Sequence, residues 1–422
     1  MPRFQLIIAL LAALCCFCAS CDKPANNQSA DNQAAAKDGN DSSTPAAEAG
    51  PADQTINPSE LPDPDHKPPR QYTAEELARF EEMLAADSAE TRNKLVDDGA
   101  MLDADHLIDY ISMGRMNIVA RMIASGMDLN RPASNGKRPL AEAILQNDPW
   151  LVEQMISHGA DPTLSDDPEH GVGRSMLHYA TKMNNPELVK RLVELGVPAD
   201  STDVNDQTPL DVAATYGETE AMAVLLANGA DPLRMDRGGS VPVLLAAGYG
   251  HTDAVRQLLK HGADINFQHE RGWTPLLLSI YYDQLDTAQF VLDNGGDINA
   301  QLETGYGAAG IAATLGDPEM LRLVIDAGAP LDDITAQDGR NLVHICAINN
   351  LASFIPELAE AGVDPAATDN EGKTPLELAR EAADSEAEQL LMELTGAPPA
   401  PPETEGAAAA EEVVEPEAGS TS

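Results

Sequence analysis

The sequence is poor in positive charge, in aromatic residues and, beyond the N-terminal segment that ends at Cys21, in cysteine. Four of its five cysteines (Cys15, Cys16, Cys18 and Cys21) lie in that segment, so only Cys346 remains downstream. A single cysteine cannot form a disulfide within the chain, so packing rather than covalent cross-links must stabilise the fold. No CxxC pair follows the N-terminal segment, which excludes a zinc ribbon or a thioredoxin-like redox site.

The shortage of positive charge is a property of the whole chain, with 26 basic against 69 acidic residues and a net charge of −43. Residues 71–396 alone contain 54 acidic and 21 basic residues, so the acidity is not confined to a tail. Such a surface repels the phosphates of nucleic acids. We therefore expect no nucleic-acid partner, and a protein partner that is neutral or basic.

The N-terminus has the layout of an export signal. Arg3 precedes the apolar run "LIIALLAAL", which is shorter than the roughly 20 residues needed to span a bilayer. Ala19 and Ser20, both small, then precede Cys21. The sequence "CASC" resembles the lipobox of bacterial lipoproteins, although Cys18 stands where that family usually has Leu, Val or Ile. An uncleaved anchor helix and an ordinary cleaved signal remain alternatives.

The lipobox resemblance implies that residues 1–21 are a signal peptide and that Cys21 carries diacylglycerol. The mature chain would then be lipid-anchored in a bacterial cell envelope and face the periplasm. Asp22 resembles the inner-membrane retention signal of enteric bacteria, which favours the inner membrane over the outer membrane or the cell surface. The membrane would be a partner only through this anchor.

Two segments contain too few large apolar side chains to form a core. Residues 22–70 are rich in Ala, Asn, Asp, Ser and Pro, and residues 397–422 form an acidic tail of Pro, Ala and Glu with no Lys or Arg. Such compositions cannot bury enough surface to offset the loss of chain entropy. We predict a disordered tether over 22–70 and a disordered tail over 397–422.

The middle of the chain repeats itself. A glycine followed by a small residue recurs at Gly159, Gly196, Gly229, Gly262, Gly295, Gly328 and Gly362, with successive steps in sequence number of 37, 33, 33, 33, 33 and 34. A second marker, "TPL" or a variant of it, keeps the same step and ends at Leu140, Leu177, Leu210, Leu276 and Leu376. The period with "TPL" and "GAD" resembles the ankyrin repeat over about residues 102–396.

This resemblance implies an all-α repeat solenoid of stacked helix-turn-helix units with β-turn fingers. We expect about eight full repeats between an N-terminal helical cap at 71–101 and a partial C-terminal cap. In the unit 206–232, Pro209 suits a first helical turn, Leu225 occupies a core position, and Gly217 and Gly229 end helices. No unit can bury its apolar face alone, so stacking makes the core.

Residues that could support catalysis occupy positions typical of the repeat. His178 and His344 stand fourth in "TPLH"-like motifs, where ankyrin repeats use histidine to link loops by hydrogen bonds. Cys346 replaces a small buried alanine and is expected to be an inert core residue. We therefore expect no enzyme, catalytic residue, metal or cofactor. A hydrolytic or metal-dependent enzyme built on a cap or on the long finger, and a secreted effector, stay as alternatives.

Aromatic residues are scarce but concentrated in adjacent repeats. Tyr216, Tyr249 and Tyr282, which we call the tyrosine ladder, lie one period apart near the ends of inner helices, on the side expected to line a concave groove. Other members of this concentration are Trp273, Tyr281 and Tyr306. Tyrosine and tryptophan are enriched at binding hot spots. We predict that these aromatic side chains contact a protein partner and that the chain is a monomer. The alternative is that the aromatic residues serve only the structure of the repeats.

The fingers carry part of the scarce positive charge, at Arg174, Arg237, Arg271 and Arg340. Arg237 and Arg271 complete the predicted partner-binding set, although these arginines could equally balance neighbouring acids. The finger that starts at Leu164 is four residues longer than the others, and extra loop length is a common place for specificity.

Overall fold

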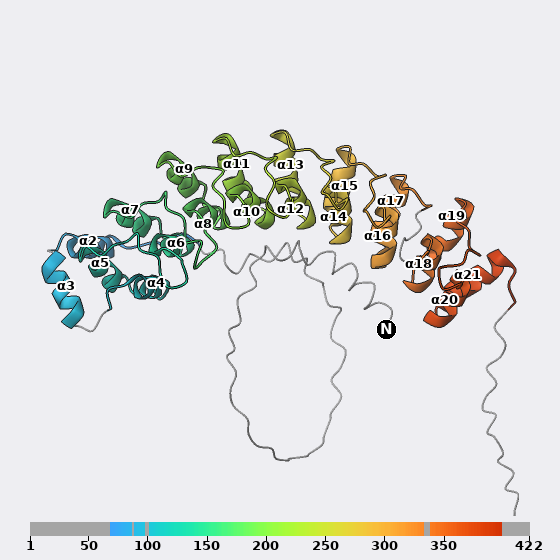
Figure 1. The fold of residues 1–422 in the computed structure, drawn as a ribbon, viewed down its shortest axis with the longest axis horizontal. Coiled ribbons are helices and arrows are strands. Elements are labelled where there is room, and N and C mark those ends of the chain that lie inside the picture. Colours follow the sequence, from blue (N-terminus) through green and yellow to red (C-terminus); the bar gives the residue numbers. More distant parts are fainter. Residues whose placement is uncertain (1–67, 87, 98–100, 333–337, 399–422) are drawn as a thin grey trace, which may run out of the picture. The chain divides into compact units, whose positions relative to one another are not determined.

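The computed structural model describes residues 68–86, 88–97, 101–332 and 338–398 (Figure 1). The predicted signal peptide with Cys21, nearly all of the tether and nearly all of the tail lie outside these residues. The described part contains 20 α-helices, one short 3-10 helix and no strand, which confirms the predicted all-α repeat fold. The described residues divide between Glu303 and Thr304 into two compact units.

The first unit is a two-row stack of short helices. Inner helices α8, α10, α12 and α14 contact one another in order, and outer helices α9, α11, α13 and α15 form the second row (Figure 1). The bounds of the helices in this unit are α2 Ala74–Leu84, α3 Ser88–Asp97, α4 Ala104–Ser112, α5 Met116–Ala124, α6 Pro139–Leu145, α7 Pro149–Ser157, α8 Met176–Lys182, α9 Pro186–Glu194, α10 Pro209–Tyr216, α11 Thr219–Ala227, α12 Pro242–Gly248, α13 Thr252–Lys260, α14 Pro275–Tyr281 and α15 Leu285–Asp293.

The second unit continues the same pattern. Helix α16 contacts α18, and α18 contacts α20, while α19 packs on α21. Its helices are α16 Ala308–Leu315, α17 Pro318–Asp326, α18 Leu342–Ile348, η3 Ala352–Phe354, α19 Ile355–Glu360, α20 Pro375–Ala382 and α21 Ser385–Thr395. The described residues thus contain eight inner–outer pairs, from α4–α5 to α18–α19, followed by α20–α21 as the last pair.

The local chemistry of each unit explains its helix bounds. Pro209 is the first residue of α10, and Thr208 caps this helix by accepting a hydrogen bond from the backbone N–H of Asp211. Gly217 ends α10 with φ of +74°, a left-handed conformation that favours glycine. In the seventh repeat, the start of α16 has no side-chain cap, because its N-cap residue is Gly307.

Neighbouring fingers are joined by backbone hydrogen bonds. The backbone N–H of Asp167 donates to the carbonyl of Gly136 in the finger before it. In the same way, the N–H of Val204 donates to the carbonyl of Val172, and the N–H of Arg237 donates to the carbonyl of Asn205. The long finger takes part in this chain of contacts on both sides. Gly136 needs to be glycine here, because a Cβ would lie 2.6 Å from the backbone nitrogen of Gly171.

Contacts among Tyr72, Phe80 and Trp150 fix the N-terminal cap to the repeats. Tyr72 packs edge-on against Phe80 of α2 and against Trp150 of α7, with ring centroids 5.5 and 5.4 Å apart. The Tyr72 hydroxyl donates to the buried carboxylate of Asp148. Arg70, at the end of the predicted tether, donates its backbone N–H to Asn147 at 2.9 Å. The contacts of the cap therefore begin just before its predicted start.

Candidate functional site

The main candidate site is an aromatic cluster built by α12, α14 and the finger before α14. Trp273 meets Tyr281 edge-on at 5.2 Å, and Tyr281 meets Tyr282 edge-on at 5.1 Å. Tyr282 is stacked on Tyr249, with ring centroids 6.4 Å apart and planes at 12°. Tyr249 also stacks on His251 at 6.5 Å. Five rings from two repeats are therefore in continuous contact.

Small residues make room for this aromatic cluster. A Cβ on Gly248, the last residue of α12, would lie 3.5 Å from the ring of Tyr282. A Cβ on Gly217 would lie 2.6 Å from the ring of His251. His251 donates its Nε2–H to the carbonyl of Thr215 at 3.0 Å, and burial lowers its pKa, so this imidazole is neutral. Tyr282 and His251 are therefore closely packed in the free chain.

The structure separates the predicted contact residues into exposed and buried sets. Tyr249 is 43 % exposed and Tyr216 is 38 % exposed, with the ammonium of Lys182 5.0 Å from the centre of the Tyr216 ring. Tyr281 and Tyr282 are half-buried. Trp273 and Tyr306 are only 3 % and 6 % exposed, so these two side chains pack inside their repeats and offer little surface to a partner.

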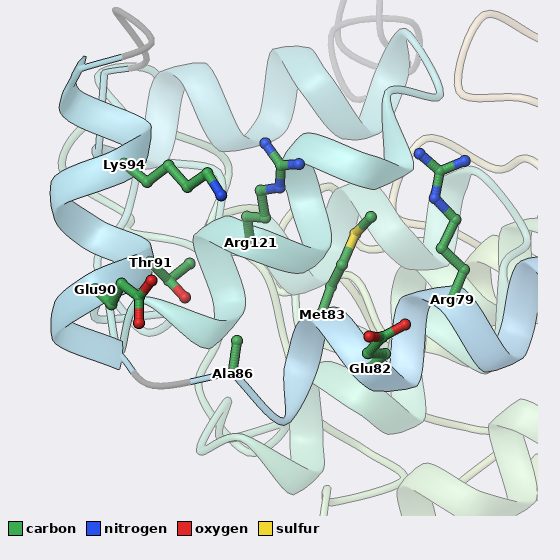
Figure 2. Close-up of a pocket in the computed structure, with 8 residues that line it drawn as sticks. All are labelled: Arg79, Glu82, Met83, Ala86, Glu90, Thr91, Lys94 and Arg121. Atoms are coloured by element: carbon green, nitrogen blue, oxygen red, sulfur yellow. The ribbon is translucent and has the colours of Figure 1, made fainter.

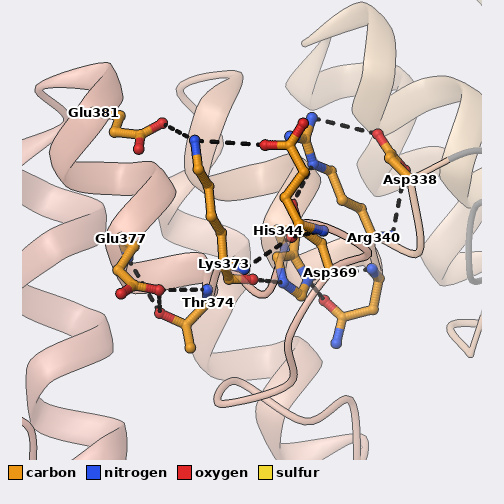
Figure 3. Close-up of polar contacts among 10 residues, drawn as sticks. Asp338, Arg340, His344, Asp369, Lys373, Thr374, Glu377 and Glu381 are labelled. Atoms are coloured by element: carbon orange, nitrogen blue, oxygen red, sulfur yellow. Dashed lines mark hydrogen bonds and ion pairs between the residues drawn. The ribbon is translucent and has the colours of Figure 1, made fainter.

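Two of the four finger arginines pair with acids of the same protein. The exposed guanidinium of Arg237 lies 3.3 Å from Asp206. Arg340 lies 3.3 Å from Asp338 and 3.2 Å from Asp369 (Figure 3). The Arg271 backbone N–H donates to the ring Nδ1 of His269 at 3.1 Å, and its carbonyl accepts from Glu303. The alternative that these arginines balance neighbouring acids therefore describes Arg237 and Arg340 well.

The two motif histidines link loops, as predicted. His178 donates its Nε2–H to the carbonyl of Gln207 at 3.0 Å, and burial lowers its pKa to about 4. His344 makes the equivalent bond to Lys373 at 3.2 Å (Figure 3). Cys346 is fully buried, and this burial raises the pKa of its thiol to about 12. The prediction that Cys346 is a buried core residue is confirmed.

Sequence reasoning missed Asp211, which occupies the position of His178 in the next repeat. One carboxylate oxygen accepts hydrogen bonds from the N–H and hydroxyl of Thr208 at 2.7 and 2.8 Å. The other oxygen is buried and has no partner among the described residues. Burial, reinforced by the charges of Asp236 and Asp203, raises its pKa to about 7. The sequence signal for this buried acid is that Asp211 stands in the fourth position of the "TPLH"-like motif, where His178 and His344 stand in other repeats.

A hollow of about 360 Å³ lies at the N-terminal cap, lined by residues of α2, α3 and α5 and of the turn after α2 (Figure 2). Its lining includes the cations Arg79, Lys94 and Arg121 and the carboxylates Glu82 and Glu90. Charges of both signs therefore face this space. The lining contains no histidine or cysteine to serve as a base or a thiol nucleophile.

The described ranges show neither a metal site nor a membrane-spanning helix. Across residues 68–398, apart from the gaps given above, no three His, Cys, Asp or Glu side chains are grouped so as to hold a metal ion. Within the same part of the chain, none of the helices has both the length and the apolar character required to cross a membrane.

Comparisons with known proteins agree with this architecture. The family model described as "Ankyrin repeats (3 copies)" matches residues 164–236 and 233–301. The E3 ubiquitin-protein ligase KEG of Arabidopsis thaliana is 38 % identical over 81 residues, which are 19 % of this chain and 5 % of the relative. NF-kappa-B inhibitor delta of Mus musculus is 35 % identical over 80 residues, or 18 % of this chain and 23 % of the relative.

A bacterial relative covers a longer stretch. The phosphocholine transferase AnkX of Legionella pneumophila is 26 % identical over 148 residues, which are 33 % of this chain and 15 % of that protein. The chain thus spans less than a quarter of the length of each of these three relatives. Residues 164–301 match ankyrin repeats, and the described helix pairs on both sides of them repeat the same helix-turn-helix unit, so the described residues have an all-α ankyrin-repeat fold.

Proposed function

We propose that this chain binds a protein partner through the tyrosine ladder and the adjoining fingers, and that it does so without catalysing a reaction. Ankyrin repeats imply protein–protein interaction, and one relative is named as an inhibitor of NF-kappa-B, which fits a binding role. Given the net charge of −43, the partner is neutral or basic, and the chain acts as a monomer.

The exposure of Tyr249 within the aromatic cluster carries this proposal. Tyr249 is 43 % exposed, although its ring is stacked on both Tyr282 and His251. A large side chain that is already fixed loses little conformational freedom on binding, so more of its contact energy appears as affinity. Tyr216, held against Lys182, offers a second exposed ring one repeat away.

We further propose that the chain is exported and lipid-anchored at Cys21 in a bacterial cell envelope, facing the periplasm. The support is the sequence alone: a basic start, an apolar run, and small residues before the cysteine. Changing Cys21→Ser should leave an unprocessed or soluble protein, whereas Cys18→Ser should still be lipidated. Mass spectrometry of the mature N-terminus decides the point, because an unmodified N-terminus at another residue would exclude the anchor.

The binding proposal is tested on a partner recovered from envelope fractions by crosslinking to the purified chain. Tyr249→Ala should weaken binding by about 1–3 kcal/mol, the range of interface hot spots. It should destabilise the fold less than Leu225→Ala, whose fully buried side chain should cost about 2–5 kcal/mol. Tyr249→Phe is the matched control, since it keeps the stacked ring.

Thermal melts and affinities are measured on the same variants. If Tyr249→Ala unfolds the protein as severely as Leu225→Ala and leaves the affinity of the folded fraction unchanged, the tyrosine ladder is repeat architecture. The binding site would then be sought first in the long finger, 164–175.

A further inference from the structure

One finger differs from its neighbours in presenting apolar side chains to solvent. This Leu233 finger, residues 231–240, joins α11 to α12, and Leu233 and Met235 at its tip are 51 % and 57 % exposed. The equivalent positions one period before are Asp200 and Thr202, and one period after are Asn266 and Gln268. Polar residues are thus replaced by large apolar ones at this single step of the series.

In three other fingers, the polar residue at the position of Leu233 bonds to the following unit. The Asn266 side chain donates to the carbonyl of Gly295 at 3.0 Å and accepts from the N–H of Asp297 at 2.8 Å. Asn130 makes the same pair of contacts with Gly159 and Asp161, at 2.8 and 2.7 Å. Asp200 accepts from the N–H of Asp231 at 3.0 Å.

The side chain of leucine can neither donate nor accept a hydrogen bond. The Leu233 finger therefore lacks this side-chain link and exposes apolar surface instead, and neither change stabilises the isolated chain.

The finger is nevertheless held in shape. The backbone N–H of Leu233 donates to the Asp231 carboxylate at 2.9 Å, and that of Asp236 donates to the carbonyl of Ser240 at 2.9 Å. The N–H of Arg237 donates to Asn205 of the preceding finger. The two apolar side chains thus project from a backbone that needs little further ordering to receive a partner.

Charge defines what the tip can accept. Arg234 stands between Leu233 and Met235 in the sequence, is exposed, and forms no ion pair with any described residue. Arg237 is already paired with Asp206, and the Asp236 side chain is buried. The exposed carboxylate of Asp231 accepts from the Leu233 N–H, so the open positive charge of the tip is the Arg234 guanidinium, which suits a carboxylate.

We propose that the tip of the Leu233 finger is a docking site for a protein segment in which two large apolar side chains flank a carboxylate. This inference rests on the proposed function, that the chain binds a protein, and it specifies the chemistry of the bound segment. The finger leads into Pro242 at the start of α12, and Tyr249 follows its end. Helix α12, which lies between the end of the finger and Tyr249, spans about 10 Å over its seven residues.

The test is a selection from a displayed library of short random peptides on the full chain. Enriched peptides should share an apolar–acidic–apolar pattern. The double variant Leu233→Asn with Met235→Gln copies the Asn266 finger and should bind these peptides at least about tenfold more weakly, the loss expected for a hot-spot contact. Its melting temperature should not fall, because the new asparagine can bond to Gly262 and Asp264.

Two further variants sharpen the result. Arg234→Glu should reverse the preference, so that peptides with a central lysine bind better than those with a central glutamate. Asn266→Leu with Phe267→Arg and Gln268→Met copies all three tip residues one period later and should transfer peptide binding to that finger. Weaker binding by the double variant together with the charge reversal supports the proposal.

Other outcomes overturn it. Equal binding by the wild type and the double variant would exclude the finger, as would an unchanged preference for acid in Arg234→Glu or the absence of any enriched peptide. If Tyr249→Ala weakens the enriched peptides and the double variant does not, only the finger is wrong and the proposed function stands.

Discussion

The buried carboxyl of Asp211 should make the stability of this protein fall as the pH rises toward neutrality. Its pKa is raised from 3.8 to about 7 by burial, with the charges of Asp236 and Asp203 adding to the effect. The folded chain therefore holds the proton over a pH range in which the unfolded chain releases it. The stabilising contribution is complete below about pH 4 and is lost as the pH rises through 7.

The size of the effect follows from the shift. About three pKa units at about 1.4 kcal/mol each correspond to a loss of about 4 kcal/mol over the whole window. Asp211→Asn removes the titration while keeping the shape and the acceptor that caps Thr208. Relative to the wild type, this variant should gain about 2–3 kcal/mol in unfolding free energy between pH 5 and pH 8.

Urea unfolding of both proteins at pH 5, 6, 7 and 8 measures this gain. Comparing the two proteins cancels the titration of groups that they share, including His178 and Asp203. Asp211→His is a second variant, because it places at this position the residue found at 178 and 344, and its neutral imidazole can donate to the Ser240 carbonyl. A stability difference between Asp211→Asn and the wild type that is the same at pH 5 and pH 8 would refute the reasoning.

Three other predictions follow from single residues. In thermal melts, Gly217→Ala should destabilise the fold more than Gly229→Ala. Both glycines have positive φ, which costs about 1 kcal/mol for alanine, but only at Gly217 would the new Cβ meet a ring, that of His251. Equal losses of stability would contradict this geometry. Cys346 should react with a thiol reagent only on unfolding, because it is fully buried and its thiol pKa is raised to about 12, and rapid labelling of the native protein would contradict this. Trp150→Ala should release the N-terminal cap and cost about 3 kcal/mol, seen as earlier proteolysis near residues 70–86, whereas an unchanged digestion pattern would show that the cap is held elsewhere.

The sequence was sufficient to predict the fold because its markers have direct conformational meaning. Pro209 fixes the start of a helix and Gly217 ends it. Such markers recur with a period of about 33 residues, so the repeat unit can be recognised without knowledge of any long-range contact. The roles of His178 and Cys346 followed in the same way from their positions in the unit.

The candidate site was less predictable, because the repeat period does not distinguish a side chain that points inward from one that points outward. Trp273 and Tyr249 belong to the same concentration of aromatic residues, yet the first is buried and the second exposed. Their connection through Tyr281 and Tyr282 depends on ring orientations that no sequence pattern records. The anchoring of Tyr72 was also missed, since its partner Trp150 lies far along the chain and outside any repeated motif.

The chain of backbone hydrogen bonds between fingers has a consequence for the evolution of this gene. The N-cap residues Thr208, Val241 and Thr274 are equivalent, and each lies one repeat period from the next. Unequal recombination between two such positions would remove or duplicate one unit and leave each finger beside an equivalent neighbour. The length of the surface can therefore change by whole repeats, and a single altered unit, such as the one with Leu233, can acquire a new specificity while the others preserve the fold.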